Sequence, residues 1–155
     1  GTWADNKSIY YSRAINEQFE IFQLNITTKQ EKQITFKGGY FSQLSDDQKF
    51  LFFNKRNQSG LWRLQLSNGQ VQLALKDFGA DNYSRWQLVD ETIFFRHHSI
   101  HGSGMFKYDL ERKVQPILKD SNIWLFNVKK DQSKVLISNQ GIAYADIKSG
   151  ALILR

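Results

Sequence analysis

The sequence repeats itself at a constant interval of 42 positions, and this feature restricts the possible folds more than any other. Two series of apolar residues follow the interval: Ile9, Leu51, Ile93 and Val135, and beside them Tyr10, Phe52, Phe94 and Leu136. A polar pair precedes each copy: Asp5-Asn6, Asp46-Asp47, Asp90-Glu91 and Asp131-Gln132. Asp and Asn are typical of tight turns because their side chains bond nearby backbone groups. A repeat of this length indicates a series of similar supersecondary units.

Each copy of the repeat predicts four antiparallel strands. The repeated apolar segment is one strand, and a stretch of strict apolar alternation follows it, for example Phe106, Tyr108 and Leu110. A turn such as Asn68-Gly69 and a short last strand close the unit, and one more strand lies ahead of each polar pair. Four strands in about 42 residues are typical of a propeller blade. A β-sandwich would not explain the constant spacing, and the alternation excludes a helical repeat.

We therefore predict an all-β fold, a β-propeller with four blades at about residues 1–35, 36–75, 80–118 and 121–155. No proline-rich or glycine-rich linker divides the chain, so a single domain is expected over residues 1–155. The chain starts with Gly1 rather than Met, and we expect it to be a partial propeller from a larger protein.

Composition excludes several classes of site. The chain has no cysteine, so disulfides, thiolate zinc sites and cysteine nucleophiles are ruled out. Apolar runs such as residues 50–53 are far shorter than a membrane-spanning helix or a signal-peptide core requires. The net charge is +6, but Lys and Arg alternate with Asp and Glu along the chain. We expect an ordinary basic surface, and no nucleic acid bound by this domain.

Several segments resemble the TolB-like propeller repeat, a relative of the WD-type blade. Residues 44–49 match its turn, although Asp46 and Gln48 replace the family's Pro and Gly, and Asp109-Leu110 matches its later strand. Residues 35–40 and 60–63, with the sequences TFKGGY and GLWR, are similar to the C-terminal propellers of CadC-like winged-helix transcriptional regulators. This resemblance implies a periplasmic sensor region of an inner-membrane protein. The DNA-binding domain and the membrane attachment would then lie upstream.

The most unusual polar cluster contains His97, His98 and His101. Three imidazoles within five residues are weak candidates for a metal site. We expect instead that they lie in a solvated loop between the second and third strands of blade 3, and we predict no metal and no cofactor. Gly102-Ser103-Gly104 does not fit the Gly-x-Ser-x-Gly nucleophile motif, and no catalytic residues are predicted.

A second set of candidates follows from aligning the repeats. The residue expected to end the second strand of each blade is Arg13, Lys55, His97 or Asn139, and Arg56, Arg96 and Lys76 lie near these positions. Equivalent strand ends would lie on one rim of a propeller. A ring of cationic groups there would attract an anionic small ligand or a protein partner. The alternative is that these side chains are simply the polar, solvated tips of hairpins.

These observations favour a binding or signal-sensing domain without catalytic activity. Two other functions remain open: a substrate-gating propeller of a prolyl-oligopeptidase-like peptidase, and a TolB-like scaffold for protein interactions. An open arc of four blades would also leave two blade faces uncovered. We therefore predict that two copies of the chain form a homodimer in which blade 1 of each packs on blade 4 of the other. The alternatives are a monomer whose four blades close in a distorted ring and an arc that associates loosely.

Overall fold

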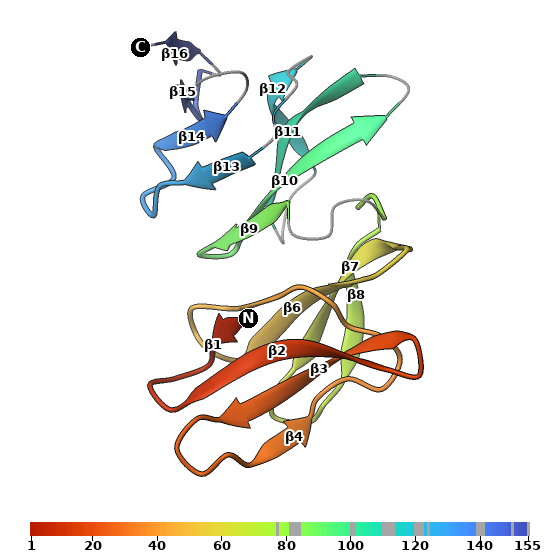
Figure 1. Cartoon of the computed structure of the whole chain (residues 1–155). Helices are drawn as coiled ribbons and strands as arrows, with labels where there is room; N and C mark the ends of the chain where they lie inside the picture. The colour runs from red at the N-terminus through yellow and green to blue at the C-terminus, as the bar shows by residue number, and fades with distance from the viewer. Residues whose placement is uncertain are drawn as a thin grey trace. The chain divides into compact units, whose positions relative to one another are not determined.

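A computed structural model describes residues 1–76, 78–80, 85–99, 102–109, 114–119, 123, 125–138, 142–149 and 151–154. The described residues form four sheets, each of four antiparallel strands joined in chain order (Figure 1). Blade 1 contains β1 (Thr2–Trp3), β2 (Ser8–Ile15), β3 (Gln18–Asn25) and β4 (Glu31–Gln33), and blade 2 contains β5 (Ser42–Leu44), β6 (Phe50–Lys55), β7 (Gln58–Gln65) and β8 (Val71–Leu75). Blade 3 contains β9 (Trp86–Val89), β10 (Thr92–Ser99), β11 (Gly102–Asp109) and β12 (Gln115–Lys119), and blade 4 contains β13 (Leu125–Val128), β14 (Lys134–Ser138), β15 (Ile142–Asp146) and β16 (Leu152–Leu154). The predicted all-β propeller fold is confirmed.

The 42-residue repeat corresponds to one structural position in each blade. Ile9, Leu51, Ile93 and Val135 all lie on the second strand of their sheet and pair with Leu24, Leu64, Tyr108 and Ala145 on the third. The last three of the four repeat residues are fully buried. The repeat in the sequence therefore records one strand position, which is a core position in blades 2 to 4.

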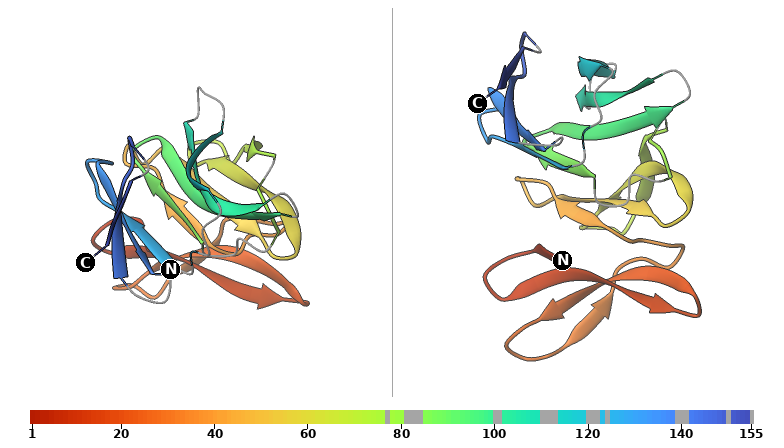
Figure 2. Two further views of the ribbon diagram at one scale, coloured as in Figure 1. Left: turned by 90° about the horizontal axis from the view of Figure 1, so that it is seen from above. Right: turned by 45° about the horizontal axis from the view of Figure 1, so that its top comes forward.

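The chain divides into two compact units, residues 1–84 and residues 85–155, and each contains two consecutive blades. In the first unit, the Thr2 hydroxyl of β1 donates a hydrogen bond to the Ser42 carbonyl of β5, which ties the two sheets together. Tyr10 and Ile21 from blade 1 share a hydrophobic core with Leu51 and other residues of blade 2. The eight-residue strands β2 and β3 twist strongly along their length (Figure 2).

The second unit joins its two blades in a similar way. The Gln87 side chain of β9 accepts a hydrogen bond from the Val128 N–H of β13 at 2.8 Å. The core of this unit includes Phe94 and Met105 from blade 3 and Val135 and Ala145 from blade 4, all of them buried. The described part of the chain holds no helix that is long and apolar enough to span a bilayer.

The acidic turns ahead of the second strands are confirmed. Asp5, Asp47 and Asp131 each accept a hydrogen bond from the backbone N–H two residues later. The Ser45 hydroxyl, which donates to Asp47, is the main reason why the pKa of that carboxyl lies below its usual value. A lowered pKa contributes stability that is present above about pH 4 and is lost as the pH falls through the pKa of the folded state.

A backbone feature recurs at the same 42-residue interval. Gln48, Asp90 and Gln132 lie in these turns or directly after them and have φ values of 57°, 50° and 54°. Side chains other than glycine are disfavoured in this left-handed region by about 1–2 kcal/mol. Gln48 stands where the TolB-like turn has Gly, so the structure keeps the turn conformation without the residue that suits it best.

Two strand ends differ from the sequence-based expectations. The second strand of blade 1 does not end at Arg13, because Ala14 and Ile15 still pair with β3 before a turn at Asn16. The second strand of blade 3 does not end at His97, because β10 extends to Ser99.

Replacing Gln48 by Gly should raise the free energy of unfolding by about 0.5–1 kcal/mol, because the relief of the left-handed conformation exceeds the entropy cost of glycine. The Gln48 N–H keeps its bond to the Ser45 carbonyl at 2.8 Å. Gln70→Gly is the matched control, since Gln70 has no positive φ, and it should destabilise the chain by about the same amount. Urea unfolding measures both, and a loss of stability in Gln48→Gly would contradict the strain assigned to this turn.

Candidate functional site

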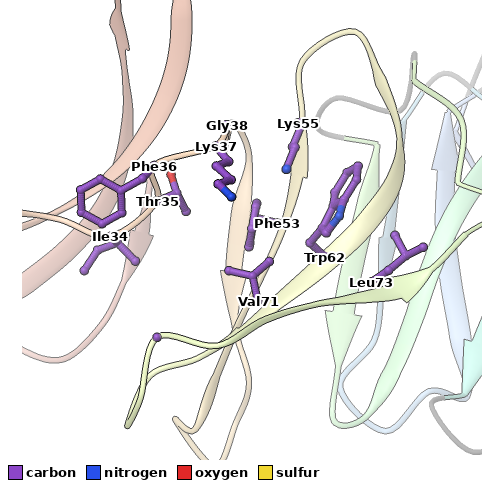
Figure 3. Close-up of a pocket in the computed structure, with 11 residues that line it drawn as sticks. Ile34, Thr35, Phe36, Lys37, Gly38, Phe53, Lys55, Trp62, Val71 and Leu73 are labelled. Carbon is purple, nitrogen blue, oxygen red and sulfur yellow. The ribbon is translucent and has the colours of Figure 1, made fainter.

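A groove lies between blades 1 and 2, within the first unit, and has a volume of about 560 Å³ (Figure 3). This volume is in the range of small-molecule sites. We call it the blade 1–2 groove. It is lined by the linker that joins the two blades and by β6, β7, β8 and the β7–β8 turn: Ile34, Thr35, Phe36, Lys37, Gly38, Phe53, Lys55, Trp62, Gly69, Val71 and Leu73.

The linker forms one wall because it stays bonded to β3 after β4 has ended. The Ile34 N–H donates to the Ile21 carbonyl at 2.8 Å, and the Gly39 N–H donates to the Phe19 carbonyl at 2.8 Å. These two bonds continue the edge of the blade 1 sheet beyond Gln33. The side chains between them, including Phe36, are therefore presented to the groove.

A buried carboxylate fixes this linker. Glu20 is 5% exposed, and it accepts hydrogen bonds from the Thr35 hydroxyl at 2.6 Å, the Gly38 N–H at 3.0 Å and the Gln18 amide at 2.6 Å. The Thr35 hydroxyl in turn accepts from the Ile21 N–H at 2.8 Å. A buried charge is tolerated only when such donors satisfy it.

The two glycines of the TFKGGY segment allow this close packing. Gly38 has a φ of 91°, which a residue with a side chain rarely adopts. A Cβ atom on Gly39 would lie 2.8 Å from both the Ile21 Cδ1 and the Thr35 Oγ1. The segment that carried the family resemblance thus gives the groove its first wall.

The GLWR segment builds the floor. Gly60 has a φ of 115°, and a Cβ atom there would lie 2.9 Å from the Trp62 ring and 3.0 Å from Leu73. The absence of a side chain leaves room for the indole of Trp62, which stacks on Phe53 with 6.4 Å between the ring centroids. Trp62 also pairs with Leu73 on β8, so the floor continues to the outermost strand.

Large apolar side chains remain exposed around the groove. Phe36 on the linker is 72% exposed, and Val71 and Leu73 on β8 are 46% and 52% exposed. Figure 3 shows Phe36 on one side and Trp62 and Leu73 on the other, with Lys37 and Lys55 between them. A gathering of exposed apolar groups in a hollow is typical of a binding surface.

Of the described residues that line the groove, Lys37 and Lys55 are the only charged ones. The Lys55 ammonium lies 4.7 Å from the centroid of the Trp62 ring, a cation–π contact. Burial lowers the pKa of Lys55, the nearby Glu20 carboxylate opposes this shift, and the charge of Lys37 adds to it. The groove thus combines an apolar floor with a partly desolvated cation.

The structure brings together only some of the residues predicted for the rim. Lys55 and Arg56 line a second hollow of about 270 Å³ that adjoins the groove at Lys37 and Gly38. The Arg56 guanidinium lies 5.2 Å from the centroid of the Phe19 ring. Lys76 is exposed directly after β8, and Asn139 lies outside the described residues.

Arg13 does not join this group. It lies on the face of β2 opposite to Tyr10, and therefore on the face turned away from blade 2. Its guanidinium bonds Glu31 at 3.0 Å and lies 4.2 Å from the centroid of the Phe22 ring. Together with Tyr11, which also bonds Glu31, Arg13 covers Phe22 to 4% exposure.

In the second unit, the Arg96 guanidinium donates to the Ile123 carbonyl at 2.6 Å. The ring of His97 meets that of Phe106 edge-on, with 5.8 Å between the centroids, and its buried Nδ1 has no hydrogen-bond partner among the described residues. Arg13, Lys55 and His97 therefore share one arrangement, each lying against an aromatic ring of the third strand of its blade.

The expected position of the histidine cluster was wrong for two of its members. His97 and His98 belong to β10 rather than to a loop, because strand pairing continues as far as Ser99 with Gly102. His101 and the side chain of His98 lie outside the described residues. Within the described part of the chain, no three His, Asp or Glu side chains gather as a metal site.

Most of the groove is not predicted from the sequence. Phe36, Trp62, Val71 and Leu73 are not among the predicted binding residues, whereas Lys55 is. Two signals were available: the glycine-containing segments 35–40 and 60–63, and the apolar residues at alternate positions of the last strand of blade 2.

Comparison with known proteins identifies the fold but no family. No protein-family model and no curated protein sequence matches the chain. TolB from Acinetobacter baumannii is similar, with a TM-score of 0.75 and 22% identity over 97% of this chain and 41% of TolB. An oligogalacturonate lyase in complex with manganese has a TM-score of 0.76 and 16% identity over 97% of this chain and 49% of the lyase. A chain of a nidogen/laminin complex has a TM-score of 0.72 and 8% identity over 97% of this chain and 60% of its own length.

These similarities confirm the TolB-like propeller fold that the repeats predicted. The chain spans about half the length of these structures. The resemblance to CadC-like regulators stays a prediction.

The Glu20 network can be tested with Thr35→Val, which keeps the shape of the side chain and removes its hydroxyl. One Glu20 oxygen and the Ile21 N–H, both buried, then lose their hydrogen bonds to the Thr35 hydroxyl. The free energy of unfolding should therefore fall by about 2–3 kcal/mol. Thr28→Val in an exposed turn is the control and should change it by less than about 0.5 kcal/mol. Equal urea midpoints for the two variants would show that the network does not hold the linker.

Proposed function

We propose that this chain is the ligand-binding, signal-sensing part of a longer TolB-like propeller protein, and that the blade 1–2 groove takes an anionic small ligand or an anionic group of a protein partner. The observation that carries the proposal is the position of Lys55. A partly buried ammonium group on an aromatic floor, open to the groove, attracts an anion more strongly than a fully hydrated one. Lys37 on the opposite wall adds a second positive charge.

We further propose that the longer protein is a CadC-like transcriptional regulator with this domain in the periplasm. The support is that the two segments similar to CadC-like propellers, residues 35–40 and 60–63, provide one wall and the floor of the groove. In this proposal the membrane attachment and the DNA-binding domain lie in the upstream part, and this domain binds no nucleic acid. A homodimer of the chain also stays a prediction.

A scaffold for protein interactions, of the TolB type, is the second candidate. The similarity to TolB favours it, and the exposed apolar residues around the groove would serve a protein partner as well as a small ligand. The two candidates differ in their output, because only a regulator changes transcription when its ligand site is altered.

The experiment uses the full-length protein in its own cells. Lys55→Glu reverses the charge of the groove, whereas Lys49→Glu places the same change just before the other end of β6, where Lys49 forms an exposed ion pair with Asp47. At equal protein levels, Lys55→Glu should alter the set of transcripts that deletion of the gene alters, and Lys49→Glu should not. The regulator hypothesis would be refuted, and the scaffold favoured, if the transcripts of Lys55→Glu cells match the wild type although those of the deletion strain differ from it.

We propose that no catalysis follows binding, and this is tested directly because one similar structure is a manganese-bound lyase. Purified protein should not turn over ester, peptide or phosphoester substrates, nor oligogalacturonate with added manganese. His97→Ala is prepared alongside, because the buried Nδ1 of His97 has no hydrogen-bond partner among the residues that the structure describes. Turnover that persists through purification and disappears in His97→Ala would identify an enzyme.

A further inference from the structure

The groove has a property that the proposed function leaves open: its lining separates charge from apolar surface. Among the described residues that line it, only Lys37 and Lys55 carry charge, and none is a carboxylate. The remaining surface is formed largely by aromatic and branched side chains, with Phe53 and Trp62 at the floor and Phe36 and Leu73 at the sides. A ligand that fits it needs an anionic end and an apolar body.

The nearby acidic group does not cancel the positive charge of the lysines. Both oxygens of Glu20 are already occupied by hydrogen bonds from Gln18, Thr35 and Gly38, and the carboxylate is buried behind the linker. Glu20 attracts Lys55 electrostatically and helps to keep it protonated. The two lysines together outweigh this one carboxylate, so the groove itself favours an anion.

The apolar part sets the second requirement. A ligand that spans the groove would remove the exposed side chains of Phe36, Val71 and Leu73 from water, and burial of this apolar surface favours binding. Phosphate, sulfate or a sugar acid would gain only the charge interaction. A carboxylate on an aromatic or aliphatic body gains both.

We infer that the blade 1–2 groove binds hydrophobic monocarboxylates, with the carboxylate at Lys55 and Lys37 and the aromatic or aliphatic body over Trp62 between Phe36 and Leu73. The inference rests on the proposed binding function and names its ligand class. The same chemistry occurs in a free aryl or alkyl acid and at the C-terminus of a peptide that ends in a hydrophobic residue.

The test measures binding by calorimetry and by the fluorescence of Trp62. The first probe is 4-phenylbutyrate, compared with 4-phenylbutyramide, which has the same body without the charge. The second is an acetylated tripeptide that ends in Phe, compared with its C-terminal amide. At least one acid should bind with a Kd of about 1 mM or tighter, and its amide about tenfold or more weakly. The acid that binds more tightly identifies the natural source.

Two matched variants locate the site. Lys55→Met keeps the aliphatic stem and removes the charge, and it should weaken the binding of the acid about tenfold. Lys49→Met removes an exposed lysine outside the groove and should leave the Kd unchanged. Trp62→Phe should lose the fluorescence response, while calorimetry still detects the acid.

The result that overturns the inference is an acid and an amide of equal affinity, or equal affinities of Lys55→Met and Lys49→Met for the acid. Failure of the ligand class is distinguishable from failure of the function. Loss of carboxylate selectivity alongside an altered transcript set in Lys55→Glu refutes only the ligand class. Selective binding alongside unchanged transcripts refutes only the regulator.

Discussion

The conformation of the linker between blades 1 and 2 depends on the buried carboxylate of Glu20. Glu20 lies on β3, yet its partners Thr35 and Gly38 belong to the linker that leads to the next blade. Removing a carboxylate from water costs several kcal/mol unless donors replace the lost hydration. The linker supplies those donors only in one conformation, so the charge selects that conformation. The wall of the groove, the position of Phe36 and the electrostatic environment of Lys55 all follow from it.

The fold could be predicted from the sequence because each blade of a propeller repeats the same four-stranded sheet. Ile93 and Val135 are fully buried at the same strand position, and the polar pairs before them form the expected turns. Each copy of the repeat has the same pattern of apolar and polar residues. The four copies could therefore be compared with one another in the way that related sequences usually are. The turn at Gln48 keeps its conformation although glutamine is disfavoured at a positive φ. Strand pairing on both sides of the turn determines the backbone conformation there.

The site could be predicted only in part, because residues at aligned positions of the repeat occupy the same strand position but contact different side chains. Arg13 and Lys55 are equivalent in the repeat, and both lie on an aromatic ring. Glu31 on β4 then pairs with Arg13, whereas Lys55 faces the linker and the exposed side chains of β8. Those neighbours come from segments far away in the repeat, and spacing alone carries no information about them. His97 and His98 were placed in a loop because their polar side chains resemble a turn, whereas β10 and β11 pair as far as Ser99 and Gly102.

Gly39 and Gly60 have a consequence for how this surface can change over evolutionary time. A single methyl group at Gly60 would push Trp62 and Leu73, and one at Gly39 would push the linker away from Ile21. Leu51 and the other residues of the 42-residue repeat are not among the groups that such a methyl group would meet, so a one-codon change at Gly60 would remodel the groove and leave them in place. A change at Gly39 would also disturb the core, because Ile21 belongs to it. Under the proposed function, lineages that no longer need a ligand are expected to lose Gly60 before they lose core residues such as Leu51. Natural sequence variation at this position would then show whether the proposed binding is still under selection.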